Sequence, residues 1–172
     1  MKMILQLKRT ALVGCCITAM VTLCACTASV TLYPVSGPYS QASPVPTFQG
    51  KISGTNKSGT FRLTMAGGEV VTGPYATIDT PPAPSDTSSG NPAAAMPNAW
   101  NVVYGAGYYN AHVVGSRLFV DANLTGTNGT TMHLQFYVPQ YTVPTNGVNT
   151  RVSDPGVAVD NHGNILKVSI HA

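Results

Sequence analysis

The groups best suited to acid–base or metal chemistry near neutral pH are the four histidines, at positions His112, His133, His162 and His171. A zinc site built on one element needs a second ligand at a spacing such as HxxxH or HExxH. No histidine here has another histidine or a carboxylate at such a spacing. The sequence therefore predicts no metal site, and we expect His133 and His171 to be solvated on the polar faces of strands.

The densest polar cluster is the segment Asp160-Asn161-His162-Gly163-Asn164. Its oxygen atoms suit a calcium loop, but it lacks the alternating acidic residues and the distal bidentate glutamate that Ca²⁺ prefers. Asn, Asp and Gly are also the residues that tight turns require. We therefore predict that this segment is the tip of a hairpin.

Hydrolytic chemistry has few candidate residues in this sequence. The nucleophile elbow G-x-S-x-G is absent, and Ser153-Asp154 would form a triad with a histidine only through long-range assembly. Glycoside cleavage would have to pair Glu69, the single glutamate, with a distant aspartate. We predict that the protein is not an enzyme and uses no cofactor, with a hydrolase of unrecognised type as one alternative.

An aromatic segment is the best candidate for a recognition surface, and it consists of Trp100, Tyr104, Tyr108 and Tyr109. Aromatic rings stack on glycans or pack against a protein partner, because they offer contact area at low entropic cost. They also fill cores beside β-sheets, which is the competing interpretation. A module that binds a small molecule or a glycan through this segment is therefore the other alternative function.

The N-terminal segment has the pattern of a cleaved signal peptide. Lys2, Lys8 and Arg9 form a basic region, and residues 11–23 form an apolar run shorter than the about 20 residues that a membrane-spanning helix needs. The run ends in Leu23-Cys24-Ala25-Cys26, which resembles the lipobox of bacterial lipoproteins, with leucine three positions before the modified cysteine and a small residue directly before it.

This resemblance implies that residues 1–25 are removed and that Cys26 is acylated, with palmitate among the attached chains. Each buried methylene adds about 0.8 kcal/mol of membrane affinity, so several chains would anchor the protein permanently. Thr27 follows the cysteine, whereas the aspartate that retains Gram-negative lipoproteins at the inner membrane is absent. We therefore expect an outer-membrane rather than an inner-membrane protein, with an ordinary secretory signal as the alternative.

The distribution of charged residues and cysteines excludes two further classes of function. Of the nine basic residues, three lie in the signal, so six basic and six acidic residues follow Cys26, and they are scattered. Nucleic-acid binding needs a clustered basic surface, so we exclude it. The other cysteines leave with the signal, which excludes thiol chemistry and disulfides in the mature chain.

The mature chain has the alternating pattern of half-buried β-strands. Apolar residues recur with a period of two from Phe48 onward, as in Phe61, Leu63 and Met65. Turn residues such as Asn128-Gly129 separate the alternating runs. This pattern predicts three hairpins, over residues 59–73, 117–138 and 156–170.

The remaining segments complete the predicted organisation. Residues 26–46 are rich in proline and are expected to be a lipidated tether, in which residues 30–35 can add an edge strand. Residues 77–97 are predicted to be a long mobile Pro/Ser-rich loop, and residues 98–109 to be either the single helix or another strand. We predict an all-β domain over residues 47–172, a small antiparallel β-sandwich or open barrel built of hairpins.

Three segments, residues 31–38, 68–75 and 159–168, resemble an uncharacterised family of small proteobacterial lipoproteins. The resemblance implies a location in the cell envelope and no known activity. Residues 63–75 also look like one MORN-type hairpin, without a second copy at a fixed period. The leading hypothesis is therefore a membrane-anchored envelope lipoprotein with a structural or protein-interaction role, bound to the membrane through Cys26 and to an envelope protein partner.

Overall fold

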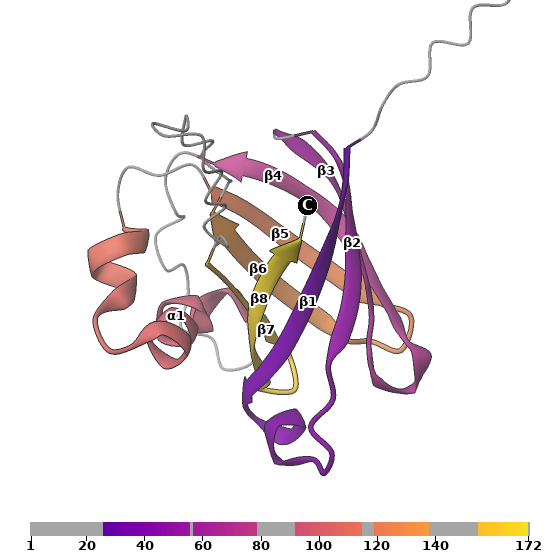
Figure 1. The fold of residues 1–172 in the computed structure, drawn as a ribbon, viewed down its shortest axis with the longest axis horizontal. Helices are drawn as coiled ribbons and strands as arrows, with labels where there is room; N and C mark the ends of the chain where they lie inside the picture. Colours follow the sequence, from indigo (N-terminus) through magenta and orange to yellow (C-terminus); the bar gives the residue numbers. More distant parts are fainter. Residues whose placement is uncertain (1–25, 56, 79–91, 115–118, 138–154, 172) are drawn as a thin grey trace, which may run out of the picture.

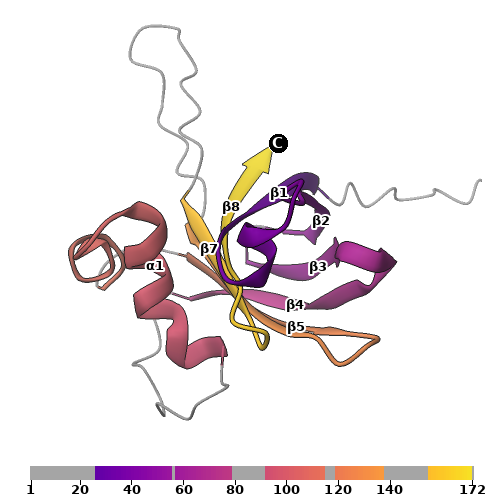
Figure 2. The ribbon, with the colours of Figure 1, turned by 90° about the horizontal axis from the view of Figure 1, so that it is seen from below.

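The computed structural model describes residues 26–55, 57–78, 92–114, 119–137 and 155–171. They form a closed antiparallel barrel of eight strands, in which each strand pairs with the next one in sequence and β8 pairs with β1 (Figures 1 and 2). The strands are β1 (Cys26–Ser36), β2 (Phe48–Gly54), β3 (Ser58–Thr64), β4 (Val70–Ile78), β5 (Phe119–Gly126), β6 (Thr131–Tyr137), β7 (Gly156–Asp160) and β8 (Ile165–His171). The all-β prediction is confirmed, but the sheet is a closed barrel and neither a sandwich nor an open barrel.

The pairing of β1 with β8 closes the barrel, and it corrects the prediction of a tether over residues 26–46. The backbone of Cys26 is in register with Gly54 on β2, and four positions along β1 the backbone of Val30 is in register with Ile170 on β8. The proline in this strand, Pro34, is tolerated because it lies at a register shift, where ladder hydrogen bonds are interrupted. Val30 and Leu32 are fully buried, so burial of this apolar pair draws the predicted edge strand into the barrel.

Apolar side chains fill the barrel interior. The predicted inward face of β3 is confirmed, since Phe61, Leu63 and the following Met65 are buried while Arg62 and Thr64 are exposed. An eight-stranded barrel is just wide enough for side chains to fill it. Large interior residues include Phe48, Phe61, Leu63, Tyr75, Leu124, Met132, Leu134, Phe136 and Leu166.

A short 3₁₀ helix, η1 (Pro38–Gln41), lies at the lower end of the barrel in Figure 1. Its Tyr39 ring packs on Phe48 at 5.1 Å between centroids, and the Tyr39 backbone N–H donates to Oδ1 of Asn164 at 2.8 Å. Residues 160–164 form the β7–β8 hairpin tip, as predicted. The buried Asp160 carboxylate accepts the backbone N–H groups of His162 and Asn164, both at 2.9 Å, so its oxygens are used by the turn.

Two more turns meet at this lower end. The short 3₁₀ turn η2 (Ala66–Gly68) leads from β3 to Glu69, as the predicted hairpin requires. The Glu69 carboxylate accepts the backbone N–H of Asn128 at 2.9 Å and the hydroxyl of Thr130 at 2.7 Å. These hydrogen bonds lower the pKa of Glu69, and the bond from the Thr130 hydroxyl has the largest effect. The carboxylate therefore links the β3–β4 turn to the β5–β6 turn.

A helical segment covers the outside of β7 and β8, and Figure 2 shows it beside the ring of strands. It comprises η3 (Pro92–Ala95), α1 (Met96–Tyr104) and the π-helical turn η4 (Tyr109–Val113). Pro97 lies in the first turn of α1, where a missing N–H costs nothing, and Gly105 ends the helix with a φ of 110°. Residues 98–109 are therefore largely helical, which decides between the two predicted alternatives.

The predicted loop over residues 77–97 is shorter than expected. β4 extends to Ile78 and η3 begins at Pro92, so the two ends of the predicted loop belong to regular elements. The central part, residues 79–91, lies outside the described residues. None of the helices in the described part of the chain is long and apolar enough to cross a membrane.

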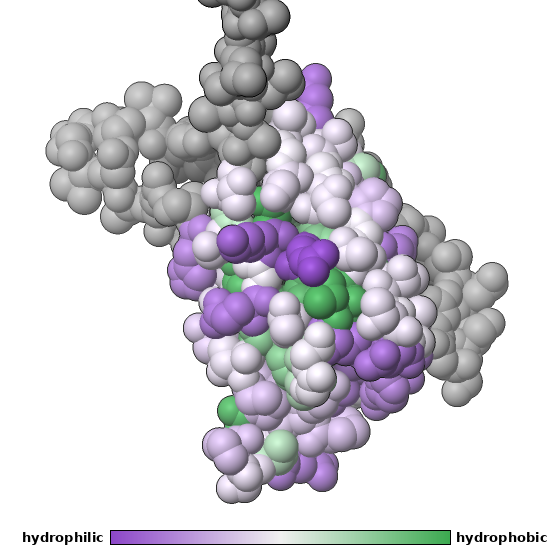
Figure 3. Space-filling view, turned by 90° about the vertical axis from the view of Figure 1, so that its right-hand side faces the viewer, coloured by the Kyte–Doolittle hydropathy of each residue, from purple (hydrophilic) through white to green (hydrophobic). Residues whose placement is uncertain are grey.

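The side of the molecule away from α1 presents a mixed surface, shown in Figure 3. Strongly hydrophilic residues adjoin weakly coloured ones, and hydrophobic residues reach the surface in small separate areas. Outward-facing residues of β2 and β3 such as Lys51, Thr60 and Arg62 are exposed. The alternation of apolar inward and polar outward residues therefore applies to this side of the barrel, as expected for strands covered on one face.

Candidate functional site

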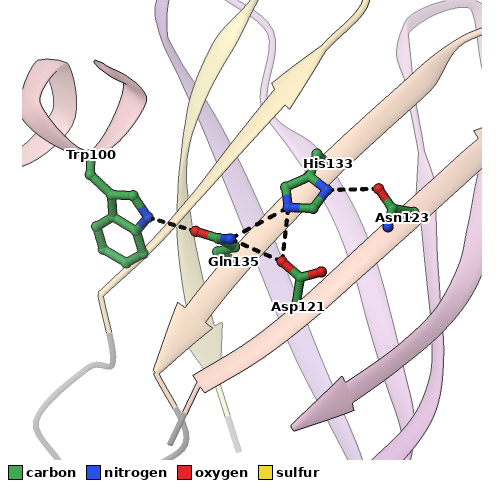
Figure 4. Close-up of polar contacts among 5 residues, drawn as sticks. All are labelled: Trp100, Asp121, Asn123, His133 and Gln135. Atoms are coloured by element: carbon green, nitrogen blue, oxygen red, sulfur yellow. Dashed lines mark hydrogen bonds and ion pairs between the residues drawn. The ribbon is translucent and has the colours of Figure 1, made fainter. Parts of the chain in front are cut away.

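The most structured polar site of the described chain lies on the outer face of β5 and β6, beside the helical segment. Cross-strand pairing places Asp121 opposite Gln135 and Asn123 opposite His133, so four polar side chains occupy adjacent positions on one face. Trp100 reaches this face from α1, as Figure 4 shows. Two strand registers and one helix therefore assemble a five-residue network from positions up to 35 residues apart.

Hydrogen bonds connect all five side chains in one chain of contacts. Trp100 Nε1 donates to Gln135 Oε1 at 3.1 Å, and Gln135 Nε2 donates to Asp121 Oδ1 at 2.9 Å. The same Asp121 oxygen lies 2.8 Å from His133 Nε2, and His133 Nδ1 lies 2.7 Å from Asn123 Oδ1 (Figure 4). Within the described residues every buried polar side-chain atom has a partner. The network therefore satisfies the polar groups that the helical segment buries.

The central carboxylate of the network is Asp121. Burial alone would raise its pKa, but the hydrogen bond and charge attraction from His133, together with the bond from Gln135, outweigh that effect and lower the pKa of Asp121. Asp121 is therefore a carboxylate at neutral pH. Asp121 accepts hydrogen bonds from Gln135 and His133, so it orients these two side chains and does not act as a proton donor.

His133 was predicted to be solvated, and that prediction is wrong. Only 4 % of the residue is exposed, because the side chains of Asp121, Asn123 and Gln135 pack around its imidazole ring on the outer face of β6. Alternation reveals which side chains share a face but not what lies above that face. His171, at the end of β8, is exposed as predicted.

The geometry around His133 also bears on the hydrolase alternative. In a catalytic triad one ring nitrogen contacts the carboxylate and the other contacts the nucleophile. Here Nε2 contacts Asp121 and Nδ1 contacts Asn123, so both nitrogens are already engaged. An Asp–His pair is present, but it is arranged to hold structure rather than to accept a proton from a hydroxyl group. The remaining triad candidates, Ser153 and Asp154, lie outside the described residues.

The predicted aromatic recognition surface is mostly part of the core. Trp100 has no exposed surface and Tyr109 is buried, while Tyr104 and Tyr108 are half-buried. The Tyr108 ring stacks on Trp100 at 5.9 Å and on Tyr104 at 4.9 Å, and it contacts His112 at 4.6 Å. The rings therefore pack against one another, as in the core-filling interpretation, and glycan binding through them stays a prediction.

Tyr104 fixes the helical segment to the start of β7. Its hydroxyl donates to the carbonyl oxygen of Gly156 at 3.1 Å and accepts the Gly156 backbone N–H at 2.9 Å. Burial raises the pKa of Tyr104 to about 12, with a smaller opposing effect from the Gly156 bond. The amine of Lys167 on β8 lies 5.7 Å from the centroid of the Tyr104 ring, within reach of a cation–π contact. A second hydrogen bond joins the helical segment to β6, because the Tyr137 hydroxyl donates to the carbonyl oxygen of His112 in η4. The helical segment is therefore bonded to the barrel at two places.

The other predicted site residue, Cys26, is the first residue of β1. Its backbone pairs with Gly54 at the end of the barrel where the chain enters and where the C-terminus also lies (Figure 1). Residues 1–25, which carry the predicted signal, lie outside the described residues. Among the described residues no group of three histidine, cysteine or acidic side chains is arranged to hold a metal ion.

Comparisons with protein-family models, with curated proteins and with solved structures found no match for this chain. The resemblance to small proteobacterial lipoproteins therefore stays a prediction, and the site has to be interpreted from its own geometry.

Sequence reasoning missed Asp121, Asn123 and Gln135 as members of a site. A signal was present, because the outward residues of β5 and β6 are carboxylate, amide and imidazole groups, whereas β2 and β3 present lysine, arginine and threonine. Short side chains that hydrogen-bond one another suit a covered face, while long cations suit a solvated one.

Proposed function

We propose that this chain is a lipid-anchored protein of the bacterial envelope that acts through contact with other envelope components and not through catalysis. The observation that carries the proposal is the lipobox-like segment Leu23-Cys24-Ala25-Cys26, which ends an apolar run behind a basic N-terminus. The proposed outer-membrane location rests on Thr27 directly after the cysteine.

The fold is compatible with cleavage before Cys26. Every described residue of the barrel follows the proposed cleavage point, because β1 begins at Cys26. Removing residues 1–25 would therefore leave all eight strand pairings of the barrel intact.

Two features of the described barrel support a contact role. The interior residues Leu32, Phe61 and Leu134 have no exposed surface, as in an eight-stranded barrel filled by its own side chains. Both ring nitrogens of His133 are engaged by Asp121 and Asn123. Both features favour action through the outer surface of the barrel.

The anchor is tested by mass spectrometry of the native N-terminus and by membrane fractionation. We expect an acylated cysteine at position 26, and we expect Cys26→Ala to move the protein from the membrane fraction to the soluble one. Cys24→Ala is the matched control, because it changes the neighbouring cysteine and keeps the modified one. An unmodified N-terminus at another residue, or a Cys26→Ala protein that stays with membranes, would refute the anchor.

The contact role is tested by crosslinking the acylated protein in intact membranes, followed by affinity purification. We expect one or a few envelope proteins to be recovered with the wild type in constant proportion. Recovery of no specific protein would count against a role in protein contact and leave the anchor standing.

A further inference from the structure

The position of Cys26 fixes how close the barrel lies to the membrane, if the proposed anchor is correct. Thr27, Ala28 and Ser29 are paired with Ser53, Ile52 and Lys51 on β2. A flexible tether, which would let the domain move away from the lipid, is therefore absent between the modified residue and the fold. The barrel end that carries Cys26 has to lie at the membrane surface.

Three cations lie on the β2–β3 hairpin, which pairs with the anchor strand β1, with Lys57 at the end of the barrel that carries Cys26 and Lys51 and Arg62 about midway along their strands. Lys51 on β2 and Arg62 on β3 are directly opposite each other on the outer face, and Lys57 lies in the turn that joins the two strands. We name these three residues the basic face. Along β2, Lys51 is three residues from the position paired with Cys26, which is about 10 Å of strand. All three side chains are exposed, and a lysine or arginine side chain spans much of that distance.

The charges of the basic face are unbalanced within the described part of the chain. No described carboxylate forms a salt bridge with Lys51, Lys57 or Arg62, since the single such contact joins His133 to Asp121. The neighbours of Lys51 and Arg62 on the flanking strands are Ser29 and Thr72, which are neutral. Like charges directly opposite each other in a sheet are unfavourable, so an external anion would stabilise this arrangement.

The described carboxylates lie elsewhere. Glu69 and Asp160 are at the opposite end of the barrel, where they hold the turns together, and Asp121 is hydrogen-bonded in the network on β5 and β6. The β2–β3 hairpin beside the anchor strand thus carries three of the four described lysine and arginine residues, the fourth being Lys167 on β8, and it carries no described acid. This distribution complements a negatively charged membrane surface, which attracts basic residues within about one Debye length.

We propose that the barrel rests on anionic lipid headgroups through the rim around Cys26 and the basic face. The end with η1, Glu69 and the β5–β6 turn then points away from the membrane and is presented to partners. This inference rests on the proposed lipid anchor and adds the orientation of the barrel and the chemistry of the lipid that it contacts.

The orientation is tested on the full acylated protein reconstituted into vesicles of phosphatidylcholine mixed with phosphatidylglycerol. An environment-sensitive fluorophore is attached at Thr60→Cys or, in a second protein, at Ala66→Cys. Both positions are exposed, and they lie near opposite ends of β3. Lipids carrying a nitroxide on the headgroup are expected to quench the fluorophore strongly at position 60 and weakly at position 66. Equal quenching at the two positions, or stronger quenching at position 66, would overturn the proposed orientation.

The role of the cations is tested with a matched pair of substitutions. Lys51→Gln is expected to reduce quenching at position 60 in the anionic vesicles, and Lys51→Gln with Arg62→Gln to reduce it further. Lys167→Gln removes an exposed lysine from the outer face of β8, beside the helical segment, and is expected to leave the quenching unchanged. In vesicles of phosphatidylcholine alone, Lys51→Gln should have no effect. An equal effect of Lys51→Gln and Lys167→Gln would refute the basic face as the lipid contact.

The two proposals fail in different ways. Absence of acyl chains on Cys26 in the mass spectrum would refute the anchor and, with it, the orientation. An acylated protein whose labels at positions 60 and 66 are quenched equally would refute the orientation alone.

Discussion

The molecule has two cores, and they are held together by different forces. The interior of the barrel contains apolar side chains from all eight strands, such as Phe61 and Leu134. The second core lies between the helical segment and the outside of the barrel, where Trp100 and Tyr104 pack beside the hydrogen-bonded network of Asp121. Burial of apolar surface is non-directional, whereas hydrogen bonds are directional. We therefore expect the interior core to contribute more to stability and the outer core to position the helical segment.

The largest expected effect tests the interior core. Phe61→Ala removes a fully buried ring, and we expect the free energy of unfolding to fall by about 3–5 kcal/mol, measured by urea denaturation. The matched control is Thr60→Ala, the exposed neighbour on the same strand, which should change it by less than about 0.5 kcal/mol. If Phe61→Ala lowered the free energy of unfolding by less than substitutions in the outer core do, the larger contribution of the interior core would be contradicted.

Asp121→Asn tests the charge at the centre of the outer core. The variant loses the negative charge that receives the hydrogen bonds from His133 and Gln135, and we expect a loss of about 1.5–3 kcal/mol at neutral pH. Because the folded pKa of Asp121 lies below its ordinary 3.8, the stabilisation is complete above that value and disappears as the pH falls through the lowered folded pKa. Unfolding curves of both proteins over an acidic pH series should therefore converge. A constant difference at every pH would show that the charge of Asp121 is not responsible.

Trp100→Phe tests whether the outer core positions the helical segment. The substitution keeps an aromatic ring and removes the donor to Gln135, so a buried acceptor is left without its partner. We expect a loss of about 1–2 kcal/mol. Amide hydrogen exchange should become faster in residues 96–113 and stay unchanged in β2 and β3. Val102→Ala, on the exposed side of α1, is the control, and faster exchange throughout the barrel would contradict a local role.

Tyr104→Phe should have the smallest effect, about 0.5–1.5 kcal/mol, through loss of both bonds to Gly156. The raised pKa of Tyr104, about 12 against an ordinary 10.0, means that its stabilisation is complete below pH 10 and is lost as the pH rises towards 12. Ultraviolet titration of the folded protein should show one tyrosine with a pKa near 12, and the variant should lack it. Persistence of that titration in Tyr104→Phe would assign it to another residue.

The interior core was predictable from the sequence, and the outer core was not. Alternation along β3 and β6 identified Phe61 and Leu134 as inward residues, because each strand has two faces and one is apolar. The same alternation assigned His133 to a solvated face, because it contains no information about which side chains pack around the ring on that face. The contact between Trp100 and Gln135 joins residues 35 positions apart on different elements, and no local pattern encodes it.

The pairing of β1 with β8, which closes the barrel, could not be predicted from the sequence pattern either. Residues 30–35 were expected to add at most an edge strand, but β1 has neighbours on both sides. The pairing of Val30 with Ile170 spans almost the whole described chain, and both residues look like ordinary strand residues locally. The proline-rich composition after Ser36 suggested a tether, although the prolines there belong to η1 and the connection to β2.

The adjacency of the first and last strands has a consequence for biogenesis. A chain that emerges from a translocation channel with its N-terminus first has β1 available long before β8, so the seam between them cannot form until residues 165–171 have been delivered. Until then β1 and β7 are open edges, which are templates for intermolecular strand pairing. The non-local seam also makes folding slow relative to its local hairpins. We therefore expect loss of the C-terminal seven-residue strand to cause aggregation rather than a slightly smaller barrel.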